Sequence, residues 1–374
     1  MRERLLAVAR GDGVADLLLT GGQVVDVFTG SVVDAEIAVA EGLIASVGPA
    51  RDAVEIVDVG GRFLLPGLID AHVHLESAMV TPYEFARAVV PRGTTAVVTD
   101  PHEVANVAGL DGVRWLLDAS QDLPLAVLVM APSCVPATHL ATTGGELDAA
   151  DLEELAGDPR IVGLAEVMNV PGVVLGDAGV HAKLEAFSGR PVDGHGPGQI
   201  LTEHLEENVC ERDGELVAEP VKGISKLAVI ERHRGTGNVG LGFLRGFGPL
   251  EGALACTIAH DHHNLIVAGG DDRSMHTAIE EIVRLGGGAV VTRGETVMAS
   301  LPLPYAGLIS DRPLAEVRAW VDELNAAAGE CGCTHPDPLM ALSFAALEVI
   351  PSLKLTDLGL VDVESFRLVS LAVC

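Results

Sequence analysis

The sequence predicts an α/β protein: an incomplete (β/α)8 barrel, preceded by a small N-terminal β-sandwich and followed by a C-terminal α+β domain. Three observations predict this class. Short apolar strands alternate with helical segments over 64–198, and polar residues follow each strand. Beyond residue 214 the alternation gives way to strands broken by glycine turns. Active sites of parallel barrels lie at the carboxyl ends of the strands, so the polar strand ends predict a site there.

The composition and charge of the chain argue against nucleic-acid and membrane partners. The chain has 374 residues, of which 48% are hydrophobic, and a net charge of −29. This charge repels phosphate backbones, so we expect no nucleic-acid partner. No apolar run is long enough to span a membrane, and the six cysteines lack the spacing of zinc or redox pairs. We therefore expect a cytoplasmic protein with reduced thiols and no membrane partner.

The N-terminal segment, 1–63, shows no residues that indicate chemistry. An amphipathic helix is predicted over 1–15. Short apolar strands bounded by glycine and aspartate follow over 15–59, a pattern typical of a small β-sandwich. We therefore assign 1–63 to part of a β-sandwich.

The strongest signal is LLPGLIDAHVHLE, residues 64–76. A short strand over 68–71 leads into His72 and His74. Side chains at positions i and i+2 of a strand point to the same face, so both imidazoles can bind one metal ion. Imidazole ligands joined by a carboxylate suit zinc, iron or manganese. The segment predicts a metal site at the end of the first barrel strand.

The barrel segment, 64–198, is too short for a complete barrel. Further strands are predicted over 94–99, 125–130, 161–164 and from 190 to 193, with helices over 82–90, 109–119 and 148–155. A complete barrel needs about 250 residues and eight strands. Only five strands precede the next module, which begins near Leu216, so the last three are predicted to be absent.

Several polar residues end these strands. Glu166 is a candidate carboxylate bridge between two metals, and His195, within DGHGPG, is a third candidate imidazole ligand. In Asp100-Pro101-His102-Glu103, the side chains hold substrate or relay a proton, or else Asp100 caps the following helix. Ser133 and Cys134 are placed to line the pocket. Neither has an evident base beside it, so neither is predicted to be a nucleophile.

Residues 199–213 are predicted to be a linker, and 214–374 a separate domain with helices over 274–285 and 313–328 and a hairpin over 288–297. The cluster His260–Asn264 lies between two apolar strands. It reaches over the barrel mouth, binds a metal, or forms a surface turn. For the glycine-rich turn 231–237 we favour a structural role over anion binding. His74-Leu75-Glu76 matches half of the zinc nucleobase-deaminase signature, but P-C-x-x-C is absent, which excludes that signature.

The chain resembles the metal-dependent adenine deaminases of the amidohydrolase superfamily. The resemblance rests on HVHLESAMVTP, TDPHEVANVAG, GLAEVMNVPGV, VDGHGPG, ERHRGTGNVGLGF, AHDHHN, LPLPYAGLISD and KLTDLGLVDV. It implies hydrolysis of adenine to hypoxanthine and ammonia by metal-activated hydroxide, in purine salvage or adenine catabolism. It also implies a two-metal site that holds Mn2+, or Fe2+ or Zn2+, and a homo-oligomer.

The resemblance also implies roles for individual residues. The metal ligands would be His72, His74, Glu166 and His195. Catalytic roles are expected for Glu166, His102 and Glu103, and substrate contacts for Glu76, Ser133, His260 and Asp261.

The chain departs from this family at one place. The strand-six histidine and strand-eight aspartate have no counterpart, because GHGPG joins QILTEHLEENV directly. Loss of the aspartate removes a proton shuttle, and general acid–base catalysis contributes typically about 10²–10⁴-fold. Two alternatives remain: a non-catalytic purine- or metal-binding remnant, and another cyclic C–N hydrolase. The motifs ERHRGTGNVGLGF and AHDHHN argue against the second.

Overall fold

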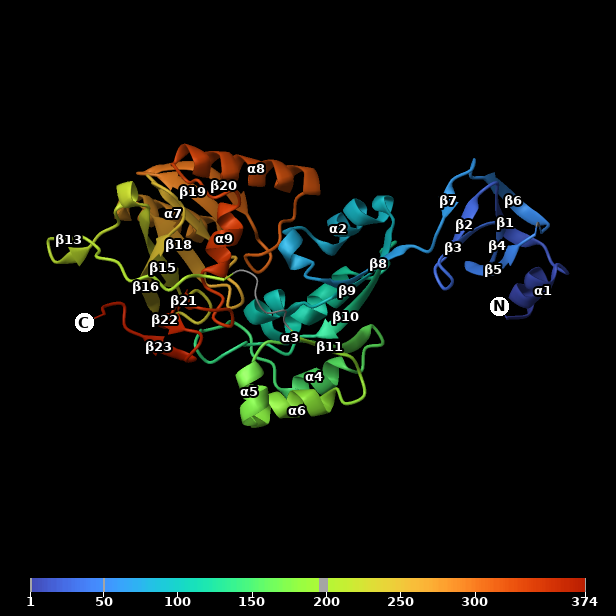
Figure 1. Cartoon of the computed structure of the whole chain (residues 1–374), viewed down its shortest axis with the longest axis horizontal. Coiled ribbons are helices and arrows are strands. Elements are labelled where there is room, and N and C mark those ends of the chain that lie inside the picture. The colour runs from blue at the N-terminus through green and yellow to red at the C-terminus, as the bar shows by residue number, and fades with distance from the viewer. Residues whose placement is uncertain (1, 50, 195–200, 374) are drawn as a thin grey trace. The chain divides into compact units, whose positions relative to one another are not determined.

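A computed structural model describes residues 2–49, 51–194 and 201–373. The chain forms two compact units, Met1–Leu68 and Ile69–Cys374 (Figure 1). No helix in the described part of the chain is long and apolar enough to cross a membrane.

The first unit contains helix α1 (Arg2–Arg10) and two small sheets, ordered β5-β4-β1-β6 and β3-β2-β7. Its strands are β1 (Ala15–Thr20), β2 (Gln23–Asp26), β3 (Ser31–Asp34), β4 (Glu36–Ala40), β5 (Leu43–Gly48), β6 (Ala53–Asp58) and β7 (Phe63–Leu64). The predicted helix and short strands are confirmed, although the helix ends at Arg10. Its core is small, built around Val8, Leu18 and Ala38.

In the second unit, a half-barrel is built on five strands in the order β12-β11-β10-β9-β8. They are β8 (Leu68–Val73), β9 (Thr94–Thr99), β10 (Ala126–Ala131), β11 (Ile161–Val167) and β12 (Val192–Gly194). Strands β9 to β12 pair in parallel. This curved parallel sheet confirms the predicted α/β class and the five predicted strands. A cluster of buried residues that includes Val97, Leu116, Val129 and Leu164 packs between the sheet and its helices.

The helices of the half-barrel differ in part from prediction. They are α2 (Pro82–Val89), α3 (His102–Ala119), α4 (Ala149–Leu155), α5 (Val170–Leu175) and α6 (Ala178–Ala186). Helix α3 begins seven residues before the predicted Gly109, which adopts φ 60° and ψ −144° inside it. This non-helical glycine kinks α3, and it separates the predicted segment from the first turns. Helices α5 and α6 were not predicted.

The C-terminal region, 201–373, is dominated by a six-stranded sheet ordered β16-β15-β18-β17-β19-β20, whose strands pair antiparallel. They are β15 (Ile224–Ile230), β16 (Val239–Arg245), β17 (Ala253–Cys256), β18 (Leu265–Gly269), β19 (Gly288–Arg293) and β20 (Thr296–Pro302). Smaller elements are the hairpin β13 (Glu211–Arg212) and β14 (Glu215–Leu216), and the sheet β21 (Leu353–Thr356), β22 (Gly359–Asp362) and β23 (Arg367–Val369).

Helices cover both faces of the six-stranded sheet. Alternate residues of β17 show this, because side chains along a strand point to opposite faces. Ala253 and Ala255 pack with residues of α7 (Asp272–Leu285). Leu254 and Cys256 pack with residues of α8 (Leu314–Glu330) and α9 (Pro338–Phe344). The predicted helices and hairpin of this region are confirmed, with ends shifted by a few residues.

Candidate metal centre

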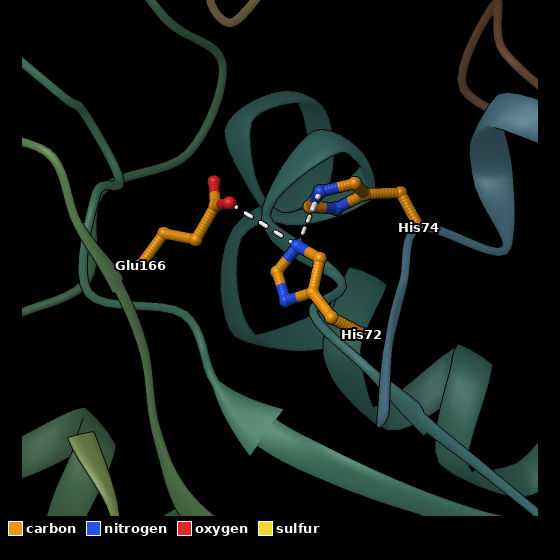
Figure 2. A group of neighbouring side chains, drawn as sticks. All are labelled: His72, His74 and Glu166. Atoms are coloured by element: carbon orange, nitrogen blue, oxygen red, sulfur yellow. Dashed lines mark hydrogen bonds and ion pairs between the residues drawn. The ribbon is translucent and has the colours of Figure 1, made fainter. Parts of the chain in front are cut away.

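The two histidines of the first barrel strand lie close together at its carboxyl end (Figure 2). Strand β8 ends at Val73, between them, and the Nε2 atoms of His72 and His74 are 3.3 Å apart. Val73 instead packs against the half-barrel core. The i, i+2 spacing therefore places both imidazoles on one side of the chain, as the sequence predicts.

The other ring nitrogen of His74 makes a hydrogen bond that orients the imidazole, whereas that of His72 faces a more distant carboxylate. His74 Nδ1 lies 2.9 Å from the main-chain oxygen of Asp100, a geometry in which Nδ1 donates the hydrogen bond. His72 Nδ1 lies 3.8 Å from Asp193 Oδ2 on β12. A proton on Nδ1 leaves Nε2 with a lone pair for a metal, as in most metal-binding histidines.

Glu166 comes from the end of β11 and completes the cluster. Its Oε1 lies 3.1 Å from His72 Nε2, and the residue is 6% exposed. The Ser133 hydroxyl donates a 2.6 Å hydrogen bond to the Glu166 main-chain oxygen and so helps to position it.

This cluster fits a divalent metal. One ligand atom from each of His72, His74 and Glu166 lies within 4.8 Å of the others. Two imidazole nitrogens and one carboxylate oxygen are donors that zinc, iron and manganese share. Three protein donors also leave coordination positions for water or substrate. The fourth predicted ligand, His195, lies outside the described residues.

The Asp100–Glu103 segment connects this cluster to buried acid–base groups. Asp100 Oδ1 accepts a hydrogen bond from the main-chain N–H of His102 at 3.1 Å, and its Oδ2 lies 2.8 Å from His102 Nδ1. Asp100 thus accepts a hydrogen bond at the start of α3 and contacts an imidazole, but the N-cap position of α3 is Pro101, without a side-chain cap bond, and not Asp100 as the capping alternative predicts. Burial opposes charge on His102, but the neighbouring anionic groups prevail and raise its pKa well above the usual range.

The His260–Asn264 cluster is not a surface turn, because all five of its residues are buried. It lies against the start of α3: His260 Nε2 is 3.3 Å from Glu103 Oε1, and Asp261 Oδ1 is 3.5 Å from His102 Nε2. Burial raises the pKa of a carboxyl group, but His260 outweighs burial and lowers the pKa of Glu103 well below its usual range. The C-terminal region therefore contributes side chains next to the predicted metal site.

Glu76 is buried beside Glu103, on a short 3-10 helix (Glu76–Ala78). Its Oε1 accepts a hydrogen bond from the Val104 main-chain N–H at 3.2 Å. Its Oε2 is buried without a hydrogen-bond partner among the described residues. Burial, followed by the charge of Glu103, raises the pKa of Glu76 to about 8, so the carboxyl group is largely protonated at neutral pH.

The glycine-rich turn 231–237 holds a carboxylate of its own. The Glu231 carboxylate accepts hydrogen bonds from the main-chain N–H groups of Arg234 and Thr236, at 2.6 and 2.8 Å. The turn therefore binds its own carboxylate, which confirms the structural role.

One buried pair was not predicted from the sequence. It joins Thr138 to Glu348, 210 residues apart in the chain, through a 3.0 Å hydrogen bond. No local pattern indicates such a contact.

Two sequence families match parts of the chain. Residues 63–234 match the amidohydrolase family, and residues 199–367 match the adenine deaminase C-terminal domain. The adenine deaminase of Desulfatibacillum aliphaticivorans is 32% identical, with 99% of each chain covered. That of Oleidesulfovibrio alaskensis is 32% identical over 98% of each chain. That of Nitratidesulfovibrio vulgaris (strain DP4) is 33% identical over 99% of this chain and 98% of its own.

The same alignments bear on the predicted deletion. The alignment to the Desulfatibacillum protein runs over 565 positions, whereas this chain has 374 residues. Subtracting 374 from 565 leaves at least 191 aligned positions without a counterpart in this chain. Because nearly all of both chains is covered, these positions lie within the aligned span.

Proposed function

The chain belongs to the adenine deaminase family, and on this premise we propose that it hydrolyses adenine to hypoxanthine and ammonia at a rate limited by its shortened barrel. The observation that supports this most directly is the convergence of His72, His74 and Glu166 at the carboxyl end of the half-barrel. Water supplies the oxygen of hypoxanthine, and the 6-amino group of adenine leaves as ammonia.

His72, His74 and Glu166 would hold a divalent metal, for which we propose Mn2+, with Fe2+ or Zn2+ as alternatives. When bound, the metal supplies acidification of water and stabilisation of developing negative charge. Orientation of His74 by the Asp100 main-chain oxygen prepares its Nε2 for this role. We propose that His195 and a second metal complete the site.

Buried acid–base groups beside the histidines would handle the substrate and its protons. We propose that the pair of Glu103 and His260 relays a proton, with the proton held by the His260 imidazole and Glu103 as its carboxylate partner, and with Glu166 as a second carboxylate. A protonated Glu76, whose Oε2 has no partner among the described residues, would donate a hydrogen bond to the purine ring. Roles for His102 in catalysis and for Ser133 and Asp261 in substrate binding remain predictions.

The domain organisation belongs to the same proposal. We propose that 1–63 forms part of a β-sandwich, 64–198 a partial amidohydrolase barrel, 199–213 a linker and 214–374 an α+β domain. The family alignment length and the start of the C-terminal match at residue 199 support a deletion near Gly198. We further propose a cytoplasmic homo-oligomer that acts in purine salvage.

An ammonia-release assay tests the function. Purified protein loaded with Mn2+ should release ammonia from adenine above the enzyme-free rate, and the double variant His72→Ala/His74→Ala should reduce release to that rate. His276→Ala is the matched control, because His276 is an exposed histidine of α7. A wild-type protein that binds metal but releases no ammonia would contradict the proposal.

That outcome would support the second candidate, a non-catalytic purine- or metal-binding remnant. The lack of counterparts to the strand-six histidine and strand-eight aspartate favours this candidate. Equilibrium binding of adenine without turnover, lost in His72→Ala/His74→Ala, would distinguish it from an inert protein.

A further inference from the structure

A second set of metal-ligating side chains lies beside the site described above. His102, Cys134 and Asp261 each offer one ligand atom, and these atoms lie within 4.8 Å of one another. Each residue is only 3% exposed. They come from three separate segments: the start of α3, the loop after β10, and the loop between β17 and β18. None of them belongs to the His72, His74 and Glu166 cluster.

The histidine of this second set is oriented as a metal ligand would be. The Asp100 carboxylate holds His102 Nδ1 at 2.8 Å, which directs Nε2 toward Asp261 Oδ1 at 3.5 Å. A carboxylate on the distal nitrogen is the usual support of a metal-binding imidazole. The Asn106 side chain also donates hydrogen bonds to the main-chain oxygens of His102 and Cys134, at 3.0 and 3.3 Å. Two of the three ligand residues are thus linked to each other.

An unsatisfied atom gives independent support. Asp261 Oδ2 is buried and has no hydrogen-bond partner among the described residues. A buried carboxylate oxygen without a partner is costly, and a bound cation would offset that cost. Asp100 and Asp261 together place two carboxylates next to one imidazole in a buried space. With the thiol bound as thiolate, a divalent cation would offset two of the three negative charges of this group.

We propose that His102, Cys134 and Asp261 form a zinc site that links the half-barrel to the C-terminal region. One nitrogen, one sulfur and one oxygen donor suit Zn2+, and thiolate ligation selects it over Mn2+. This site shares His102 and Asp261 with the residues predicted above for catalysis and substrate binding, but its metal content can be measured without adenine deamination. The competing arrangement is a protonated His102 shared between Asp100 and Asp261, which requires neither metal nor thiolate.

Cobalt substitution of the full-length protein tests the proposal, because this is the one candidate ligand set among the described residues that contains a sulfur donor. Protein loaded with Co2+ should show a near-ultraviolet thiolate-to-cobalt charge-transfer band. The band should persist in His72→Ala/His74→Ala, which removes the first site, and disappear in Cys134→Ser. Cys256→Ser is the matched control: it alters another buried cysteine, whose Sγ contacts the main-chain oxygen of Ile258.

Zinc content provides the second measurement. In the His72→Ala/His74→Ala background, about one equivalent of Zn2+ per chain should survive dialysis, and Asp261→Asn should remove it. Should Cys134→Ser fail to fold, the wild-type cobalt spectrum and Asp261→Asn still decide the question. A folded wild-type protein without the sulfur band, or a band that survives Cys134→Ser, would overturn the zinc site. Absence of ammonia release would leave both measurements unchanged, so failure of the proposed function is distinguishable.

Discussion

The six-stranded sheet of the C-terminal region is covered on both faces, whereas the sheet of the half-barrel is exposed at its first strand. Every residue of β17 and β18 is buried. In β8, by contrast, Leu68 to His72 are all exposed, and Ile69 is 67% exposed. Parallel sheets normally depend on neighbouring strand–helix units for cover, while an antiparallel sheet can be complete within one segment. A deletion of barrel units therefore leaves one sheet open and the other intact.

The chain carries a probe of each region. Its two tryptophans are Trp115 on α3, against the half-barrel core, and Trp320 on α8, against the core of the C-terminal region. Trp320→Phe leaves the fluorescence of Trp115, which reports on the half-barrel and on its contact with Tyr305, whose ring centroid is 5.7 Å away. Trp115→Phe leaves fluorescence that reports on the C-terminal region.

The largest expected difference is in the loss of unfolding free energy when one apolar side chain is truncated in each sheet. Leu254→Ala on β17 should lower the free energy of unfolding by about 2–5 kcal/mol, because Leu254 is fully buried. Ile69→Ala on β8 should change it by less than about 0.5 kcal/mol. Urea denaturation followed by Trp320 and Trp115, respectively, measures the two values. Equal losses would mean that β8 is covered in solution, for example by a second copy of the chain.

The junction between the regions should show a pH dependence. Burial raises the pKa of Glu348 to about 8 from its ordinary 4.5. The folded state thus holds this proton more tightly than the unfolded chain. The resulting stability is complete below about pH 4.5 and is lost as the pH rises through about 8.

Glu348→Gln mimics the neutral carboxyl group at every pH. Relative to wild type, this variant should gain stability as the pH rises above about 5, by about 3 kcal/mol near pH 7 and by about 5 kcal/mol above pH 8. Urea denaturation at several pH values measures the gain. Thr138→Val, which removes the hydrogen bond to Glu348 but not its charge, is the control. Parallel pH profiles of wild type and Glu348→Gln would show that Glu348 keeps an ordinary pKa.

Metal addition should act on the half-barrel. Mn2+ at about one hundred times its dissociation constant should stabilise the folded protein by about 2.7 kcal/mol. The midpoint temperature of thermal unfolding, followed by Trp115 fluorescence, should rise on addition of Mn2+ and fall back when the metal is removed by a chelator. The shift should be absent from His72→Ala/His74→Ala and present in His276→Ala. A shift of equal size in all variants would place the stabilising metal elsewhere.

The smallest expected effect compares two helix caps. Asp148 Oδ1 accepts hydrogen bonds from the Ala150 and Asp151 main-chain N–H groups at the start of α4, at 2.8 and 3.0 Å. Asp148→Ala should cost about 1 kcal/mol. Asp271 at the start of α7 also accepts two hydrogen bonds, from the main-chain N–H and the hydroxyl of Ser274. Asp271→Ala should cost somewhat more, because Ser274 is fully buried and its hydroxyl would lose its acceptor. Denaturation midpoints, followed by Trp115 for Asp148→Ala and by Trp320 for Asp271→Ala, measure the loss of stability in each variant. A larger loss of stability for Asp148→Ala would reverse the expected order.

Local patterns predicted much of the fold. Strand 94–99 is found at the predicted residues, and α4 begins within one residue of the predicted start at 148. Helix α5 was missed because its six residues, VPGVVL, contain proline, glycine and β-branched valines, which are weak helix formers. Its start is instead defined by the Asn169 side chain, which accepts a hydrogen bond from the Gly172 main-chain N–H.

The predicted site was accessible from sequence only in part. The spacing of His72 and His74 and the strand-end position of Glu166 are local signals, and the structure brings these residues together. The contacts of His260 with Glu103 and of Asp261 with His102 join segments more than 150 residues apart. Such contacts depend on how the two regions pack, which neither spacing nor periodicity encodes.

The contact between Glu103 and His260 also affects how the protein can be recombined. The pKa of Glu103, a residue of the half-barrel, is lowered by an imidazole from the C-terminal region. A chimera that takes residues 214–374 from a relative lacking this histidine would leave a buried carboxylate without its counter-charge. Its pKa would rise, although the half-barrel sequence had not changed. The pKa of Glu103 therefore depends on residues of both segments, and replacing one segment alone would change this pKa.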